Sequence, residues 1–194
     1  MRESVDEIAS DPLSGRLASR LEALRRERGL TLEELATATG ISRATLSRIE
    51  RAETSPSAAQ LGRLAAALGR AMSRLLADVE ATPTALVRRS DQALWTDPET
   101  GFRRRMVSPP AEGLRLEVIE GEIPPGASLA YDAVPVAGLE HHVVMLAGRL
   151  CLTVDGVTHE LAAGDCLRFR LSGPTRYAAP GPDAAHYLIA LGRP

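Results

Sequence analysis

The sequence lacks lysine altogether, has only two cysteines and contains no long apolar run. All 23 basic residues are therefore arginines. Cys151 and Cys166 form neither a metal-ligand spacing nor a disulfide framework, so we expect reduced core thiols. A redox pair stays open only if the two lie within about 7 Å of each other. No stretch approaches the roughly 18 apolar residues that span a bilayer. The acidic N-terminus does not resemble a secretory signal, so we expect a cytoplasmic protein.

Charge is distributed unevenly along the chain, whose formal net charge is -2. The segment from Leu13 to Leu76 holds eleven arginines against six acids, which gives it +5 and leaves -7 for the rest. A basic module joined to an acidic one is expected where only the first meets phosphate groups. The 194 residues are enough for two small domains, each with its own core.

Helix signals fill the first 77 residues. Apolar residues recur at helical spacing at the start, and Gly29 ends that first helix. Thr31 and Glu34 have the spacing of a capping box at the start of a second helix, which Gly40 ends. Ser42 is the expected cap of a third helix. Two further helices are expected, one opening at Ser55–Ser57 and ending at Gly69, and a short one over Ser73–Leu76.

The third helix is expected to expose a basic face. Ile41, Leu46 and Ile49 anchor its other side to the core. A helix fits the major groove of B-DNA, and arginine can bond both acceptors of guanine, with about 1–3 kcal/mol of discrimination per contact. The exposed positions share one face: Arg43, Ala44, Ser47, Arg48 and Arg51.

The stretch TLEELATATGISRATLSRIER, from Thr31 to Arg51, resembles the Xre/lambda-repressor family of helix-turn-helix (HTH) regulators. The resemblance covers all five expected helices, from about Leu13 to Leu76. It implies a phosphate contact from Thr31 at the start of the second helix. It also implies base or nearby phosphate contacts from Ser42, Arg43, Ala44, Ser47 and Arg48. The alternative is a plain helical bundle with solvated arginines.

Two positions are assigned to structure by the same resemblance. Arg25 and Glu50 match residues that commonly form an internal ion pair in the family. Ala52 departs from the family, which usually has glycine after the recognition helix. We therefore expect strain in that turn.

Beyond a proline-containing break at Ala81–Thr84, the apolar period changes to two. Leu114, Leu116 and Val118 alternate with the residues that follow them, and glycine or proline separates several later apolar runs. Many short strands with regular turn signals predict an all-β sandwich or barrel. The runs lie at 143–146, 150–154, 166–171 and 187–191.

This half resembles a cupin, a small β-barrel, from about Ala111 to Gly192. The resemblance is carried by Glu140–Leu150, by the Asp155-Gly156 turn and by Leu161–Asp165. In metal-binding cupins the ligands include a histidine pair, a glutamate and a further histidine. By the resemblance, these ligands fall within 131–137, at the position of His141 and at the position of Thr175, and this chain has none of the expected residues there. Metal sites normally need three protein ligands or more, so we expect no metal, no cofactor and no catalytic residue.

A barrel without a metal can still hold a small molecule in its mouth. The expected effector pocket contains Tyr131, His141, Met145, Thr175 and Tyr177. His141 is alternatively a hydrogen-bonded interior histidine, and the tyrosines alternatively pack in the core or at the rim. His142 is expected to point away from His141 along the strand. The run Arg103-Arg104-Arg105 is either a solvated strand face or places one inward arginine against an anionic effector.

The sequence thus predicts a multi-domain α and β protein, with an N-terminal five-helix HTH bundle followed by a C-terminal cupin β-barrel. The expected divisions are a flexible N-terminus (1–11), the HTH domain (12–77), a linker and first strand region (78–100) and a cupin domain for sensing and dimerisation (101–194).

The predicted function is sequence-specific regulation of transcription, without enzyme activity. The expected partners are double-stranded DNA, a small-molecule effector and a second copy in a homodimer, with no membrane. Two alternatives remain: a metal-dependent cupin enzyme with accessory helices, and a regulator whose barrel is purely architectural.

Overall fold

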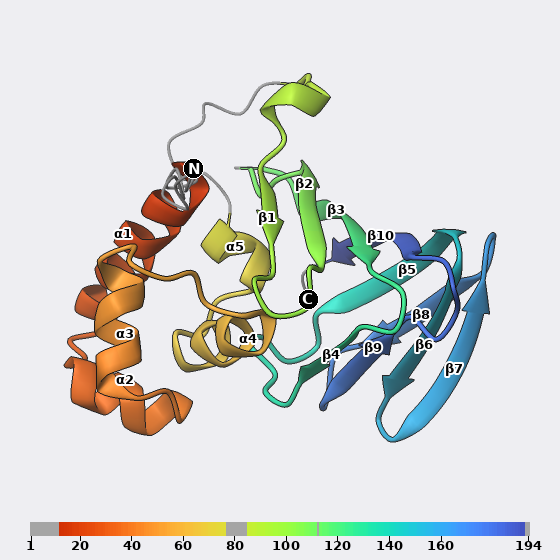
Figure 1. Ribbon diagram of the computed structural model, residues 1–194. Helices are drawn as coiled ribbons and strands as arrows, with labels where there is room; N and C mark the ends of the chain where they lie inside the picture. Colours follow the sequence, from red (N-terminus) through yellow and green to blue (C-terminus); the bar gives the residue numbers. More distant parts are fainter. Residues whose placement is uncertain (1–11, 77–84, 112, 193–194) are drawn as a thin grey trace, which may run out of the picture.

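Five α-helices precede ten β-strands in the computed structural model, which describes residues 12–76, 85–111 and 113–192 (Figure 1). The order confirms the predicted helical half and β half. The expected flexible segment 1–11 and the break at 81–84 lie outside the described residues. The helices are α1 (Pro12–Glu27), α2 (Leu32–Thr39), α3 (Arg43–Glu50), α4 (Ala58–Ala67) and α5 (Met72–Leu76).

The helix ends follow local capping chemistry. Thr31 accepts a hydrogen bond from the Glu34 backbone N–H through its hydroxyl at 3.2 Å, and its own N–H donates to the Glu34 carboxylate at 2.8 Å. This is the predicted capping box. Ser57 and Gln60 form a second one at the start of α4. Gly40 ends α2 with φ at +64°, a conformation that glycine adopts at little cost.

The strands form two antiparallel sheets that face each other as a barrel. Six strands, in the order β1-β2-β3-β10-β5-β8, make the larger sheet, and four, in the order β4-β9-β6-β7, make the smaller one. The strands of the larger sheet are β1 (Leu94–Thr96), β2 (Arg103–Ser108), β3 (Leu116–Ile123), β10 (Ala185–Gly192), β5 (Glu140–Ala147) and β8 (Cys166–Arg170). Those of the smaller sheet are β4 (Ser128–Tyr131), β9 (Thr175–Ala178), β6 (Arg149–Val154) and β7 (Val157–Ala162).

The alternation predicted around β3 is present, but the side chains that turn inward are not the leucines. Glu117 and Ile119 are buried, whereas Leu114 and Leu116 are about three-fifths exposed. Period-two spacing identifies a strand without saying which face meets the core. The packing of the sheet on α5 and on the smaller sheet decides that.

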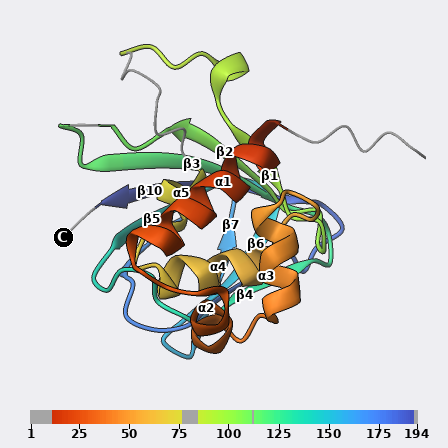
Figure 2. The ribbon, with the colours of Figure 1, turned by 90° about the vertical axis from the view of Figure 1, so that its left-hand side faces the viewer.

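The helices and the barrel share one continuous core. Leu21, Leu46 and Leu64 are buried inside the helical bundle. They belong to the same buried cluster as Trp95 and Ile119 of the barrel. Helix α4 packs against β4 (Figure 1), and Arg74 of α5 pairs with Glu117 of β3, so these two helices form the junction. Helices α2 and α3 lie on the far side of the bundle from the barrel, and Figure 2 shows them facing the viewer in front of it.

Candidate DNA interface and barrel cavity

Helix α3 presents the predicted face to solvent. Ser42 caps its first turn by accepting the Thr45 N–H at 3.1 Å. Leu46 and Ile49 are buried on its inner side, while Arg43, Ala44 and Arg48 are exposed. Ser47 is half-buried between them. The exposed arginines are therefore available to a groove that α3 enters.

The arginines of this face are held only by weak partners. Arg43 lies 3.3 Å from Glu33 and Arg51 lies 2.7 Å from Glu53, and all four side chains are about half exposed or more. Exposed ion pairs of this kind are worth about 0–1 kcal/mol. Arg48 has no ion pair within the described part of the chain. A phosphate or base that approaches α3 thus has little to displace.

Arg25 and Glu50 sit behind this face in a two-pronged ion pair. The Arg25 Nε and Nη2 atoms donate to the two Glu50 oxygens at 2.7 and 2.8 Å, and Nη1 donates to the Leu30 carbonyl at 2.8 Å. The Glu50 hydrogen bond and charge raise the pKa of Arg25. Both side chains are about one-tenth exposed, so the pair joins α1 to α3 from inside.

The turn after α3 has the strain expected there. Ala52 has φ at +58°, a left-handed conformation that costs a non-glycine residue about 1–2 kcal/mol. Glycine at this position would avoid that cost.

A cavity of about 80 Å³ lies inside the barrel against the helical bundle. One water molecule requires about 10–15 Å³, so the cavity volume is enough for a small molecule. Gly62, Ala71 and Met72 of the helical half line one side of it. Of the expected pocket residues, Tyr131, His141, Thr175 and Tyr177 line the cavity, whereas Met145 is buried elsewhere in the barrel.

Two nitrogen-bearing side chains face the cavity without partners. Arg104 is only 8% exposed, and no hydrogen bond or ion pair joins its guanidinium to the described residues. Both ring nitrogens of His141 are buried and unpartnered as well, so the hydrogen-bonded interior interpretation of His141 is wrong. Burial, and then the Arg104 charge, lower the pKa of His141 to about 4. His142 points outward as expected and contacts Glu140 at 2.9 Å.

Three tyrosines form an aromatic wall of the same cavity. Tyr131 meets Tyr177 edge to face, and Tyr177 stacks on Tyr187, with centroid separations of 6.0 and 6.1 Å. Burial raises the pKa of Tyr131 to about 12 and also raises the pKa values of Tyr177 and Tyr187. All three hydroxyls therefore stay protonated at neutral pH.

The sequence did not indicate several residues of the cavity wall. It left an inward position of Arg104 as one of two interpretations of the arginine run. The solvated-face interpretation of the arginine run fails for Arg104, because period two along β2 turns it inward with Phe102 and Met106. Those two apolar neighbours were the available signal. Gly62 was also missed, although glycine inside a helix often marks a close packing contact.

The cavity does not fit the metal that cupins commonly hold. Among its lining residues only His141 is a usual metal ligand, and the Arg104 charge beside it opposes a bound cation. Within the described ranges, no three His, Cys, Asp or Glu residues gather in a way that would hold a metal ion.

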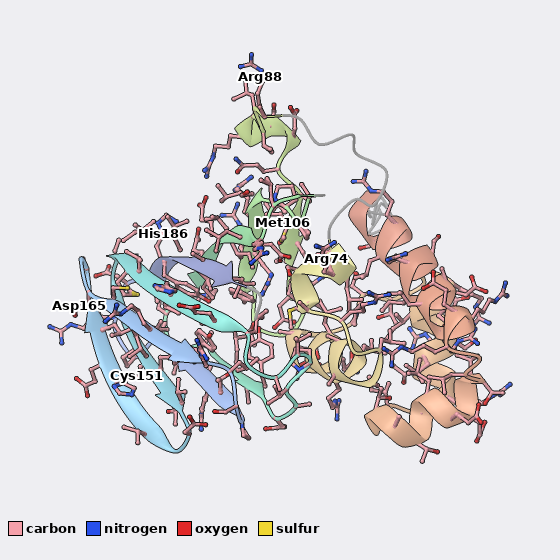
Figure 3. All side chains as sticks on the ribbon, turned by 180° about the vertical axis from the view of Figure 1, so that it is seen from behind. Arg74, Arg88, Met106, Cys151, Asp165 and His186 are labelled. Carbon is pink, nitrogen blue, oxygen red and sulfur yellow. The ribbon has the colours of Figure 1, made fainter. Side chains whose placement is uncertain are left out.

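The cysteines are not core thiols. Cys166 is exposed on β8 of the larger sheet, and Cys151 is half-buried on β6 of the smaller sheet. Neither forms a disulfide with a described residue. Figure 3 places Cys151 at the end of the barrel remote from the helices.

Three contacts fix the helices to the barrel. The Asp97 carboxylate, after β1, accepts the backbone N–H of Ala58, the first residue of α4, at 3.2 Å. Arg74 of α5, at the junction in Figure 3, pairs with buried Glu117 of β3 at 3.5 Å. A Cβ on Gly62 would lie 2.9 Å from the Tyr131 ring, so the ring packs directly on the α4 backbone.

The helical half matches a family model described as "HTH_3: Helix-turn-helix" over residues 21–75. Residues 21–75 form an HTH_3 domain. The chain is 29% identical to the HTH-type transcriptional regulator SutR of Escherichia coli strain K12, covering 92% of this chain and 95% of SutR. It is also similar to the crystal structure of an HTH_3 family transcriptional regulator from Vibrio cholerae. That match has 28% identity and a TM-score of 0.75, and covers 94% of this chain and 97% of the other.

The barrel half is similar to the Cupin_2 domain of an XRE family transcriptional regulator from Enterobacter cloacae. Identity is 24% and the TM-score is 0.45, with 48% of this chain and 97% of that domain covered. Five helices followed by a two-sheet barrel are the predicted arrangement of the fold. No helix of the described residues is both long and apolar enough to cross a bilayer.

Proposed function

We propose that this chain is a sequence-specific DNA-binding regulator of transcription, with α3 as its recognition helix. The observation that carries the proposal is the exposed arginine face of α3 within an HTH_3 domain. In this proposal Arg43 and Arg48 contact base edges. The residues proposed to contact bases or neighbouring phosphates are Thr31, Ser42, Ala44, Ser47 and Arg51.

A homodimer would place two copies of α3 on two half-sites, about one helical turn of DNA apart. The outer side of the larger sheet supports this, because it exposes apolar side chains on two of its strands. Leu116 of β3 is 60% exposed, and Val144 and Leu146 of β5 are 36% and 43% exposed. Light scattering should give the mass of two chains for the wild type, and of one chain for Leu116→Glu/Leu146→Glu.

The barrel is proposed as the effector domain. Its cavity is large enough for a small molecule and carries unpartnered polar side chains. An effector regulates only if it binds the DNA-competent and incompetent arrangements with different affinity. The unpartnered polar side chains of the cavity favour effector binding over a purely architectural barrel. The metal-ligating residues that line the cavity are too few to favour a metal-dependent enzyme.

A gel-shift titration on the DNA upstream of the chain's own gene tests the DNA-binding role. Arg43→Ala and Arg48→Ala should each weaken specific binding by about 1–3 kcal/mol if the residue reads a base. Loss of a phosphate contact would instead lower the salt slope by about 1. Arg149→Ala changes an exposed arginine on the barrel and serves as the matched control. No shift by the wild type, or equal affinity in all three variants, would refute the proposal.

A further inference from the structure

We infer that the barrel cavity binds a small organic monocarboxylate, whose carboxylate pairs with Arg104 and whose apolar body lies against the tyrosine wall. This inference rests on the proposed role of the barrel as an effector domain. It adds the chemical class of the effector and the residues that hold it.

The charge of the cavity is the first reason. Arg104 is a nine-tenths buried cation with no ion pair or hydrogen bond among the described residues. Burial of an unpaired charge is costly, so a buried arginine is normally paired. No lining residue is Asp or Glu. The Glu117 carboxylate interacts with the Arg104 charge, but it does not line the cavity and it pairs with Arg74 at 3.5 Å. The missing partner of Arg104 is thus an anion from outside the chain.

The neutral polar groups of the cavity suit the same anion. His141 stays uncharged because its pKa is about 4, so one ring nitrogen donates a hydrogen bond and the other accepts one. The Tyr131, Tyr177 and Tyr187 hydroxyls stay protonated and have no hydrogen bond to the described residues. A carboxylate, whose two oxygens offer about four acceptor sites, can accept from several of these donors.

Size and shape narrow the ligand to a carboxylate with a short body. One guanidinium compensates one charge, so a dianion would keep one charge unpaired in a largely apolar space. The planar fork of arginine matches the two oxygens of a carboxylate. Ile119, Leu139 and Ile189 line the remainder with aliphatic carbon. The volume of about 80 Å³ accommodates a few heavy atoms beyond the carboxylate.

The position of the cavity connects the ligand to the HTH domain. Gly62 of α4 and Met72 of α5 line it, and the Tyr131 ring rests on Gly62. The Arg104 charge acts on Glu117, which binds Arg74 of α5. A carboxylate bound to Arg104 therefore changes the charge acting on the Arg74–Glu117 ion pair, which fixes α5. The same carboxylate ligand lies in a cavity whose wall includes Gly62 of α4.

Calorimetric titration of the full chain without DNA tests the inference directly. The probes are isobutyrate and benzoate, their neutral amides isobutyramide and benzamide, and the anions methanesulfonate and inorganic phosphate. We expect binding of at least one carboxylate at millimolar concentration or below, and at least tenfold weaker binding of its amide. Failure of both carboxylates, equal binding of the amides, or preference for methanesulfonate or phosphate would overturn the inference.

Three variants assign the binding to Arg104. Arg104→Met keeps an unbranched side chain without the charge and should weaken carboxylate binding at least tenfold. Arg103→Met changes the outward neighbour on β2 and should leave binding unchanged. Unchanged binding by Arg104→Met, with a normal far-ultraviolet circular dichroism spectrum, would overturn the assignment. Arg104→Lys keeps the charge without the fork, so intermediate affinity is the expected result.

A DNA-binding variant separates this inference from the proposed function. Arg43→Ala/Arg48→Ala should bind the carboxylate as the wild type does, because both residues lie on the far side of the bundle. If the wild type fails to shift DNA but binds the carboxylate through Arg104, only the regulatory role fails. If it shifts DNA but binds no carboxylate, only the present inference fails.

Discussion

At the scale of single residues, the barrel interior keeps polar groups at a cost to stability. Arg104 and both nitrogens of His141 are buried without partners among the described residues. Unsatisfied buried polar groups each cost about 1–3 kcal/mol. Such groups are expected where a ligand completes the bonding, and the histidine makes the stability of the barrel sensitive to pH.

We predict that His141 makes the protein less stable in mild acid. The pKa of His141 is about 4 in the folded chain, against 6.5 for an unperturbed histidine. As pH falls below 6.5, the unfolded chain takes up the proton first, so the free energy of unfolding decreases until pH reaches about 4. Each pKa unit is worth about 1.4 kcal/mol, so the whole loss is at most about 3 kcal/mol.

Urea unfolding at a series of pH values measures this effect. His141→Leu should remove it, and its free energy of unfolding should change less than that of the wild type between pH 6.5 and 4. His142→Gln, on the outward side of the same strand, is the control and should follow the wild type. Parallel curves for the wild type and His141→Leu would contradict the prediction.

At the scale of helices and strands, local signals predicted the elements and tertiary packing decided their faces. The capping box at Thr31 and Glu34 and the glycine stop at Gly40 depend on neighbouring residues, so the sequence reveals them. The inward turn of Arg104 and the outward turn of Leu116 depend on which elements cover each side of the larger sheet. Period two carries no such information. The short strands β4, β7 and β9 contain too few apolar residues in sequence to be recognised.

Helix α4 is held by a cap that comes from the barrel. Asp97 accepts the N–H of Ala58 across the junction, and also the N–H of Glu99. The free N–H groups at a helix start carry partial positive charge, so a carboxylate there is stabilising. No local pattern could have identified this cap, because Asp97 lies 39 residues after Ala58.

We predict that Asp97→Ala lowers the free energy of unfolding by about 1–3 kcal/mol, because it leaves the buried Ala58 N–H without an acceptor. Asp97→Asn retains an acceptor oxygen and should lose less. Hydrogen exchange should show the first turn of α4 exchanging faster in Asp97→Ala. Asp91→Ala removes an exposed carboxylate nearby in sequence and should leave α4 exchange unchanged.

At the scale of the whole molecule, the two halves are joined where the cavity lies. Helices α4 and α5 belong to the HTH core and also close the barrel, while α3 faces away from it (Figures 1 and 2). Helix α4 packs on α2 and α5 packs on α1, and both α1 and α2 pack on α3, so packed helices connect the cavity wall to α3. This arrangement requires close contact at the junction, and Gly62 is the residue that permits it.

The coupling across the junction is measurable at Gly62 and Tyr131. Alanine favours a helix over glycine by about 1 kcal/mol, so Gly62→Ala should stabilise α4 if nothing else changed. The new Cβ would however lie 2.9 Å from the Tyr131 ring, which is itself packed on Tyr177. We predict that Gly62→Ala destabilises the wild type but stabilises the Tyr131→Ala background, which gives a coupling energy of about 1 kcal/mol or more.

Gly15→Ala in α1, where a Cβ meets nothing within 4 Å, should be stabilising in both backgrounds. Urea unfolding of the four chains of the cycle decides the matter, since the same change in both backgrounds would mean that α4 and the barrel are not coupled through this contact.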